Sequence, residues 1–205
     1  MSEIQAKVKT VLNADPIMRP VVAQLAFPLA LENRDPDFDL VRTIVYQQLS
    51  VKAADTIFER FLDLFEDRWP HIGQLIDLDL DQLRSVGLSR QKADYVKNVA
   101  VFFQEENLLS YPWDDKEEDS ILDLLTRIKG VGQWTAEMIL MFTLNRPDVF
   151  PLGDLGIQTA VSKLYGVSKE GKDWKERMTR IAEAWRPYRT YASRYLWNYL
   201  DSGIL

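Results

Sequence analysis

The segment Ile121–Asp154 reads ILDLLTRIKGVGQWTAEMILMFTLNRPDVFPLGD and contains two apolar helical runs joined by a short turn at residues 129–132. Apolar residues recur at helical spacing on both sides of the turn, at Ile121, Leu124, Leu125 and Ile128 before it and at Trp134, Met138, Met141 and Phe142 after it. Gly130 and Gly132, on either side of Val131, let the chain reverse sharply and leave its N–H groups accessible. Because these groups open a helix, where unsatisfied donors and the helix dipole favour an anion, Lys129-Gly130-Val131-Gly132 predicts a phosphate-binding helix-hairpin-helix.

A turn of this kind also occurs as a purely structural corner between helices. The residues that follow it favour a function, because a second helix and a proline-containing loop deliver Asp154 to the start of another helix. In this order of elements the chain resembles the helix-hairpin-helix DNA glycosylase superfamily, whose pattern ends in one catalytic aspartate. Three strings are most similar to its alkylation-repair branch, the 3-methyladenine DNA glycosylase II type: IKGVGQWTA at 128–136, VFPLGDLGIQ at 149–158 and WRPYRTYASRYLW at 185–197.

Composition limits the other possibilities. The 205 residues, 46% hydrophobic and 27% charged, are typical of a soluble globular protein with one large domain or two helical lobes. The absence of cysteine excludes disulfides, a thiol nucleophile and a cysteine-ligated iron–sulfur cluster, and a single histidine, His71, argues against zinc sites and Ser-His-Asp triads. Without a membrane-length apolar run or a signal-like N-terminus, we expect a cytoplasmic protein, nucleoid-associated in a prokaryote.

The net charge of −6 opposes bulk attraction to DNA. The acidic residues are clustered, however, in the runs 114–119 and 77–81. Basic residues are spread over the segments that we expect to face DNA, namely Lys52, Arg90, Lys92, Lys97, Lys129 and Lys163. Since a backbone-amide contact needs less side-chain charge, DNA binding remains the expectation.

No segment shows strand-like alternation, so the predicted fold is all-α. The resemblance, which covers roughly residues 38–200, implies a two-lobed helical fold with the active site in the interlobe cleft. We expect three parts: residues 1–37, helices that pack with the C-terminal lobe; residues 38–112, an N-terminal helical lobe; and residues 113–205, a C-terminal lobe with the hairpin and the aspartate loop.

Two adjacent glutamines, Gln47 and Gln48, interrupt an apolar helix just before Ser50, which is expected to cap the next one. They could simply end the helix and bond to nearby backbone, because buried amides need partners. The resemblance implies a different role, in which Gln48 fills the space left by a flipped nucleotide and Gln47 lies beside it.

Asp154 is the candidate catalytic residue. On residue type alone it is equally a good N-cap for the helix that follows, and Asp148 is the fallback. A carboxylate can stabilise the oxocarbenium-like transition state of glycosidic bond cleavage and orient water, and the resemblance assigns that role to Asp154. Relatives with lyase activity carry a lysine two positions after the second hairpin glycine. Trp134 stands there, which implies a monofunctional enzyme.

Alkylated purines carry positive charge, and aromatic faces attract cations. The resemblance implies that Trp134 and Trp197 line the base pocket, with Tyr46 as a further wall and Met138 in the place of an aromatic residue of some relatives. Core packing is the alternative for each of them, and Trp174 and Trp185 are assigned to the core. The resemblance further implies a monovalent cation (Na⁺ or K⁺) held by the carbonyls of Thr126, Ile128 and Val131, and no organic cofactor or iron–sulfur cluster.

The sequence therefore predicts a monofunctional DNA glycosylase that excises alkylated purines, such as 3-methyladenine and 7-methylguanine, from double-stranded DNA by base flipping. We expect it to act as a monomer with no membrane partner. Two alternatives remain: a non-catalytic helix-hairpin-helix DNA-binding protein, which would not need Asp154 or the aromatic residues, and a glycosylase for a neutral lesion such as uracil, for which the glutamine pair would supply hydrogen bonds.

Overall fold

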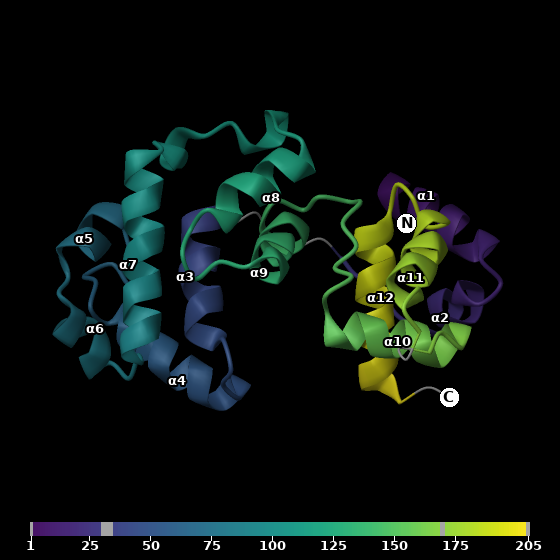
Figure 1. Ribbon diagram of the computed structural model, residues 1–205, viewed down its shortest axis with the longest axis horizontal. Helices are drawn as coiled ribbons and strands as arrows, with labels where there is room; N and C mark the ends of the chain where they lie inside the picture. Colours follow the sequence, from purple (N-terminus) through teal and green to yellow (C-terminus); the bar gives the residue numbers. More distant parts are fainter. Residues whose placement is uncertain (1, 30–34, 169–170, 204–205) are drawn as a thin grey trace. The chain divides into compact units, whose positions relative to one another are not determined.

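The computed structural model describes residues 2–29, 35–168 and 171–203, which form helices and turns without a β-strand (Figure 1). The prediction of an all-α fold is confirmed. The chain divides into two compact units, a central unit of residues 32–144 and a terminal unit of residues 1–31 and 145–205. No helix within the described ranges has the length and apolar character needed to cross a membrane.

The central unit is built on two helices that pack together, α3 (Pro36–Tyr46) and α7 (Arg90–Glu105). Helix α4 (Val51–Leu62) packs on α3, while the short α5 (Ile72–Asp77) and α6 (Leu80–Ser85) pack on α7, drawn in teal in Figure 1. The chain then continues through η1 (Leu108–Ser110), η2 (Trp113–Asp115), α8 (Glu118–Thr126), α9 (Gln133–Met138) and the π-helical turn η3 (Ile139–Thr143).

Local sequence signals set the starts of three of these helices. Ser50, as predicted, and Ser89 accept hydrogen bonds from backbone N–H groups three residues later, and Asp79 forms a capping box with Gln82. Gly87, at φ +109°, makes the turn between α6 and α7. These caps and turns place α7 so that its apolar side, including Val96 and Phe103, is buried.

Two lysines expected to face DNA are instead used inside the central unit. The Lys92 ammonium donates to the carbonyl of Val45, at 2.8 Å, near the end of α3. The Lys97 ammonium donates to the carbonyls of Leu75, Ile76 and Leu78 at the end of α5. The last carbonyls of a helix have no partner within it, so a cation there is favourable. Burial lowers the pKa of Lys92.

The terminal unit joins the two ends of the chain in one core. Helices α1 (Glu3–Ala14) and α2 (Met18–Gln24) pack together, and α2 also packs on α12 (Arg189–Ser202), which packs on α10 (Leu155–Tyr165) (Figure 1). Helix α11 (Trp174–Glu183) adds Met178 and Ala182 to the same core. The core buries residues from both ends of the chain, such as Leu12 and Ile157.

The division of the chain differs from the expected boundary at residues 112 and 113. Residues 113–144, including both helices of the hairpin, belong to the central unit. The reason is packing: η3 lies against α3, where the Thr143 hydroxyl donates to Asp39 Oδ2 at 2.7 Å in a buried site. A boundary set by such long-range contacts is not marked by a change in composition.

Trp185 lies at the centre of the terminal unit and is fully buried, as expected. Its indole N–H donates to Asp15 Oδ2 at 3.0 Å, and the Tyr165 hydroxyl donates to the same oxygen at 2.6 Å. Burial alone would raise the pKa of Asp15. The bonds from Tyr165, Trp185 and the N–H groups of Ile17 and Met18 outweigh burial and hold this pKa below its ordinary value.

We therefore expect Trp185→Ala to lower the free energy of unfolding by about 3–5 kcal/mol, because it opens a large cavity and removes a donor to the partly buried carboxylate of Asp15. Trp185→Phe retains most of the volume and should lose less. Urea unfolding of both variants measures the difference. A loss below about 1 kcal/mol for Trp185→Ala would contradict the assignment of this side chain to the core.

Candidate active site

The hairpin turn between α8 and α9 is held from outside by α7. The Asn98 amide donates to the carbonyl of Lys129 at 3.0 Å, and the Val131 N–H donates to the carbonyl of Ile128 at 2.9 Å. The side chain of Val131 is buried, while Lys129 is exposed. The turn therefore lies at the surface, and the bond from Asn98 and the buried Val131 side chain hold it in place.

The two glycines of the turn have different surroundings. Gly130 has φ +109°, and a Cβ there would lie 2.3 Å from Cγ of the Tyr95 ring, so both backbone strain and packing require glycine. Gly132 is exposed and is the N-cap of α9, and a Cβ there would meet nothing within 4 Å. The fold does not require glycine at this second position, whereas close approach of a ligand to the backbone would.

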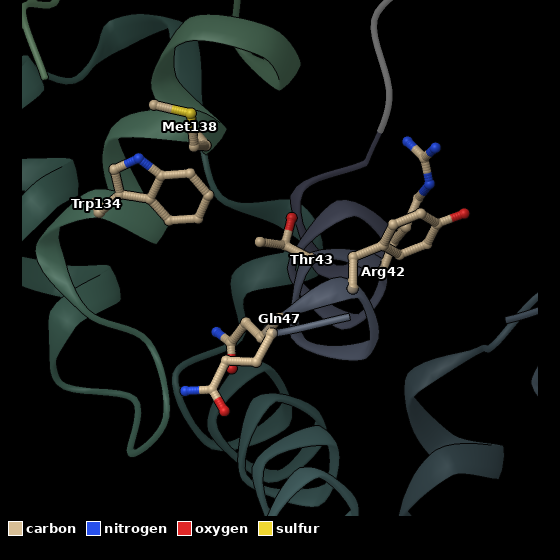
Figure 2. Close-up of a pocket in the computed structure, with 7 residues that line it drawn as sticks. Arg42, Thr43, Gln47, Trp134 and Met138 are labelled. Carbon is tan, nitrogen blue, oxygen red and sulfur yellow. The ribbon is translucent and has the colours of Figure 1, made fainter. Parts of the chain in front are cut away.

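A cavity of about 520 Å³ opens beside the hairpin, between α3 and α9. Trp134 and Met138 extend into it from α9, opposite Thr43 and Gln47 (Figure 2). The full lining is Arg42, Thr43, Tyr46, Gln47, Gln48, Trp134 and Met138. The structure thus brings together five of the residues singled out in the sequence, namely Tyr46, Gln47, Gln48, Trp134 and Met138.

The walls of this cavity differ in character. The Arg42 guanidinium lies 5.0 Å from the centre of the Tyr46 ring, and the Tyr46 hydroxyl donates to Asp55 Oδ1. Burial, followed by the bond to Asp55, raises the pKa of Tyr46. Trp134, in contrast, is 43% exposed although it is a large aromatic side chain. Such exposure is unusual for a residue that serves only packing.

Gln48 adopts a left-handed backbone conformation with φ +57°, which is uncommon for a residue of this size. It follows the end of α3, where the Gln47 N–H donates to the carbonyls of Thr43 and Ile44. Gln48 and the following Leu49 are exposed, and Leu49 shows 39% of its surface. Strained, exposed residues of this kind concentrate at functional sites.

Sequence reasoning missed Arg42 and Thr43 as lining residues. Both lie one helical turn before Tyr46 and Gln47, so they occupy the same face of α3. That spacing was readable in the sequence, since any residue four positions before a candidate pocket residue on one helix is itself a candidate.

Asp154 lies in the terminal unit, at the N-cap of α10. Its Oδ1 accepts from the Ile157 N–H at 2.8 Å and from the Trp197 indole N–H at 2.9 Å. Its own N–H donates to the carbonyl of Pro151 at 2.9 Å. Asp154 therefore caps α10, as its residue type predicts. Its carboxylate is half-buried and held in one orientation by these bonds.

Trp197, expected as a pocket aromatic, belongs to the terminal unit and is bonded to Asp154, so it is not among the residues that line the cavity of the central unit. Gly156 adjoins this bond. A Cβ at Gly156 would lie 3.0 Å from Asp154 Oδ1 and from Trp197 Cδ1. Glycine there leaves room for the tryptophan and the aspartate to meet.

Asp148, the fallback catalytic residue, is held in a network of ion pairs. Arg189 Nε lies 2.7 Å from its Oδ1, and Arg186 Nη1 lies 2.6 Å from its Oδ2. Trp174 is partly buried against the core of the terminal unit. Across the described ranges, His, Asp and Glu side chains do not gather in threes or more in a way that could hold a metal ion.

The hairpin, the exposed aromatic cavity and the bonded aspartate at a helix start are features of a helix-hairpin-helix protein that acts on DNA. Residues 41–187 match the family model described as HhH-GPD superfamily base excision DNA repair protein. The chain belongs to this superfamily.

Similar proteins are found in several organisms. A DNA-3-methyladenine glycosidase of Bacillus halodurans of known structure is 34% identical, with a TM-score of 0.83 over 94% of this chain and 88% of that one. The Schizosaccharomyces pombe 3-methyladenine DNA glycosylase in complex with abasic DNA is 30% identical, with a TM-score of 0.82 over 95% and 97% of the two chains. YfjP of Bacillus subtilis is 32% identical over 168 residues, which are 79% of this chain but only 58% of YfjP.

Proposed function

We propose that the protein is a monofunctional DNA glycosylase that hydrolyses the N-glycosidic bond of alkylated purines, such as 3-methyladenine and 7-methylguanine, in double-stranded DNA. The observation that carries the proposal is the oriented carboxylate of Asp154, which follows the hairpin in a chain of the HhH-GPD superfamily. The names of the two relatives of known structure support the substrate class.

Asp154 supplies the chemistry in this proposal. As the C1′–N bond lengthens, positive charge grows on the sugar, and a fixed carboxylate stabilises it and orients the attacking water. Two N–H donors on Oδ1, from Ile157 and Trp197, keep the carboxylate in place. With Trp134 where lyases carry lysine, no amine is offered for a Schiff base at that position, and the product is an intact strand with an abasic site.

The cavity of the central unit recognises the flipped base. Trp134 provides an aromatic surface on which a cationic base can stack, and Met138 and Tyr46 complete the walls. Gln48 enters the duplex in place of the flipped nucleotide, with Gln47 beside it. Its exposed position and left-handed backbone support this role.

The hairpin binds the DNA backbone through the N–H groups at the start of α9, with Lys129 as an additional phosphate contact. The resemblance of this hairpin to those of the superfamily also implies a monovalent cation at the same turn. The carbonyls of Thr126, Ile128 and Val131 would hold it, and such a cation would add positive charge beside a phosphate. We propose that the protein acts as a monomer in the cytoplasm or on the nucleoid.

The substrate class is tested with duplexes that each carry one lesion: 7-methylguanine, uracil or no lesion. We expect release of the methylated base only, with strand breaks appearing only after hot alkali. Release of uracil alone would favour the neutral-lesion alternative. Tight binding to every duplex without release of any base would favour the non-catalytic alternative.

Trp134→Ala should lower the single-turnover rate of base release by about 5- to 150-fold, because stacking of a base on an aromatic side chain contributes about 1–3 kcal/mol. Since Trp134 is 43% exposed, the free energy of unfolding should change by less than about 1 kcal/mol. Trp113→Ala is the matched control, because Trp113 packs on Tyr111 away from this cavity and its loss should leave the rate unchanged. Equal rates for the native protein and Trp134→Ala would remove Trp134 from base recognition.

A further inference from the structure

Both ends of the loop at residues 145–154 are attached to one helix, α12. The beginning of the loop is bonded to Arg189 and Thr190 in its first turn, and Asp154 is bonded to Trp197. Thr190 and Trp197 are two helical turns apart, so they lie on the same face of α12 and about 10 Å apart along its axis. Helix α12 therefore spans the loop that delivers Asp154.

Thr190 bonds the backbone of three residues near the start of the loop, Arg146, Pro147 and Val149. Its N–H donates to the carbonyl of Pro147 at 3.0 Å, and its hydroxyl donates to the carbonyl of Arg146 at 2.6 Å. The same hydroxyl accepts from the Val149 N–H at 2.9 Å. Thr190 is only 3% exposed. Loss of the hydroxyl would leave buried backbone groups without partners, which shifts the loop or weakens it.

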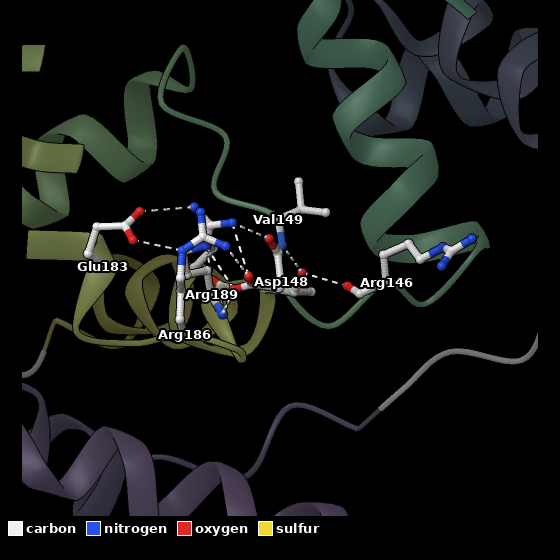
Figure 3. Close-up of polar contacts among 8 residues, drawn as sticks. Arg146, Asp148, Val149, Glu183, Arg186 and Arg189 are labelled. Atoms are coloured by element: carbon white, nitrogen blue, oxygen red, sulfur yellow. Dashed lines mark hydrogen bonds and ion pairs between the residues drawn. The ribbon is translucent and has the colours of Figure 1, made fainter. Parts of the chain in front are cut away.

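Arg189 binds Asp148, the loop residue between Pro147 and Val149. Its Nε lies 2.7 Å from Asp148 Oδ1 and its Nη2 lies 3.0 Å from Oδ2, while Nη2 also donates to the Asp148 carbonyl at 2.8 Å (Figure 3). Arg186 contacts Asp148 Oδ2, and Glu183 pairs with Arg186. The side chains of Arg189 and Asp148 are 16% and 18% exposed, so this planar pair is largely shielded from solvent.

Between these contacts and Asp154, further residues of the loop are also held by packing and hydrogen bonds. Val149 is buried, Phe150 packs edge-on against Trp185, and the Gln158 amide donates to the Leu152 carbonyl. The Asp154 N–H then bonds the Pro151 carbonyl. We therefore expect a displacement at Thr190 to shift the carboxylate through this short segment, whose backbone is bonded at Val149, Leu152 and Asp154.

We infer that Thr190 and Arg189 are positioning residues for Asp154. Both lie in the first turn of α12 and hold the beginning of the loop, while Trp197 on the same helix holds the Asp154 carboxylate at its end. This inference rests on the proposed function for its effect on rate, but not for its effect on structure. Misplacement of a reacting group by about 1 Å can cost about 100-fold in rate. The bonds at Thr190 therefore affect catalysis although Thr190 touches no substrate.

Thr190→Val tests this directly, because it keeps the shape of the side chain and removes its hydroxyl. We expect the single-turnover rate at saturating protein to fall by about tenfold or more, with DNA affinity within about twofold of native. Thr190→Ser keeps the hydroxyl and should restore the rate to within about threefold. Thr10→Val, which removes a hydroxyl bonded only within α1, should have no effect. If Thr190→Val does not fold, Arg189→Lys replaces it in the test. This variant keeps the charge but loses the planar fork, and the same loss of rate by about tenfold or more is expected.

A second readout does not depend on activity. The proton shift of the Trp197 indole N–H reports its bond to Asp154, and it is assigned by its disappearance in Trp197→Phe. Thr190→Val should move this signal, while the indole signals of Trp69 and Trp113 in the central unit should stay. An unmoved Trp197 signal, or a rate loss explained entirely by weaker DNA binding, would overturn the inference. If the native protein releases no base, the proposed function fails and the Trp197 signal alone decides.

Discussion

Asp154→Asn is expected to abolish nearly all base release, lowering the single-turnover rate by about 10²- to 10⁴-fold, while the protein stays folded and binds DNA. The substitution removes the negative charge that the transition state needs. It preserves the amide oxygen, which can still accept from the Ile157 N–H and the Trp197 indole, and asparagine caps helices as well as aspartate does. The variant therefore tests the catalytic role of Asp154 while its capping role is retained.

The measurement is release of 7-methylguanine with protein in excess over DNA, accompanied by urea unfolding and a binding titration. Asp148→Asn serves as the comparison. It weakens the pairs with Arg186 and Arg189 and should lower stability, but it should retain more activity than Asp154→Asn. The opposite order of activities would assign the chemistry to Asp148.

The two hairpin glycines should respond to alanine in opposite ways. Gly130→Ala forces a left-handed residue to carry a Cβ 2.3 Å from the Tyr95 ring, and we expect a loss of about 3 kcal/mol or more in the free energy of unfolding from strain and overpacking together. Gly132→Ala meets no neighbour, so the protein should keep its stability to within about 1 kcal/mol. Its added methyl would instead stand where a phosphate approaches the turn, and DNA affinity should fall about tenfold or more.

Thermal unfolding and fluorescence titration with an abasic duplex measure the two effects separately. Unchanged DNA affinity in a stable Gly132→Ala protein would mean that the backbone at this position does not contact phosphate. A stable Gly130→Ala protein would contradict the observed contact with Tyr95.

Features that depend on neighbouring residues were predictable from the sequence. Ser50 caps a helix and Gly130 turns the chain, as predicted, because capping and left-handed turns depend on a few adjacent residues. The all-α fold follows from helical periodicity for the same reason.

Features that depend on distant residues were not predictable in this way. Lys92 and Lys97 lie in a basic stretch that looks suited to DNA, but carbonyls of α3 and α5 occupy their ammonium groups. The π-helical turn at the end of the hairpin, where the Leu144 N–H bonds the Ile139 carbonyl, packs on α3, which is distant in the sequence.

The candidate site likewise contains residues that were predicted from the sequence and a long-range contact that was not. Tyr46, Gln47, Gln48, Trp134 and Met138 were singled out in sequence and share one cavity. The bond between Trp197 and Asp154 joins residues far apart in the chain. The resemblance assigned both residues to the active site, but no local pattern predicted a hydrogen bond between them.

The central claim is tested most directly by identifying what the native protein releases from methylated double-stranded DNA. The proposed function predicts free 7-methylguanine and 3-methyladenine in the supernatant, in amounts equal to the alkali-labile sites left in the DNA, and neither above background with Asp154→Asn. DNA that is bound but yields no free base and no alkali-labile site would contradict it.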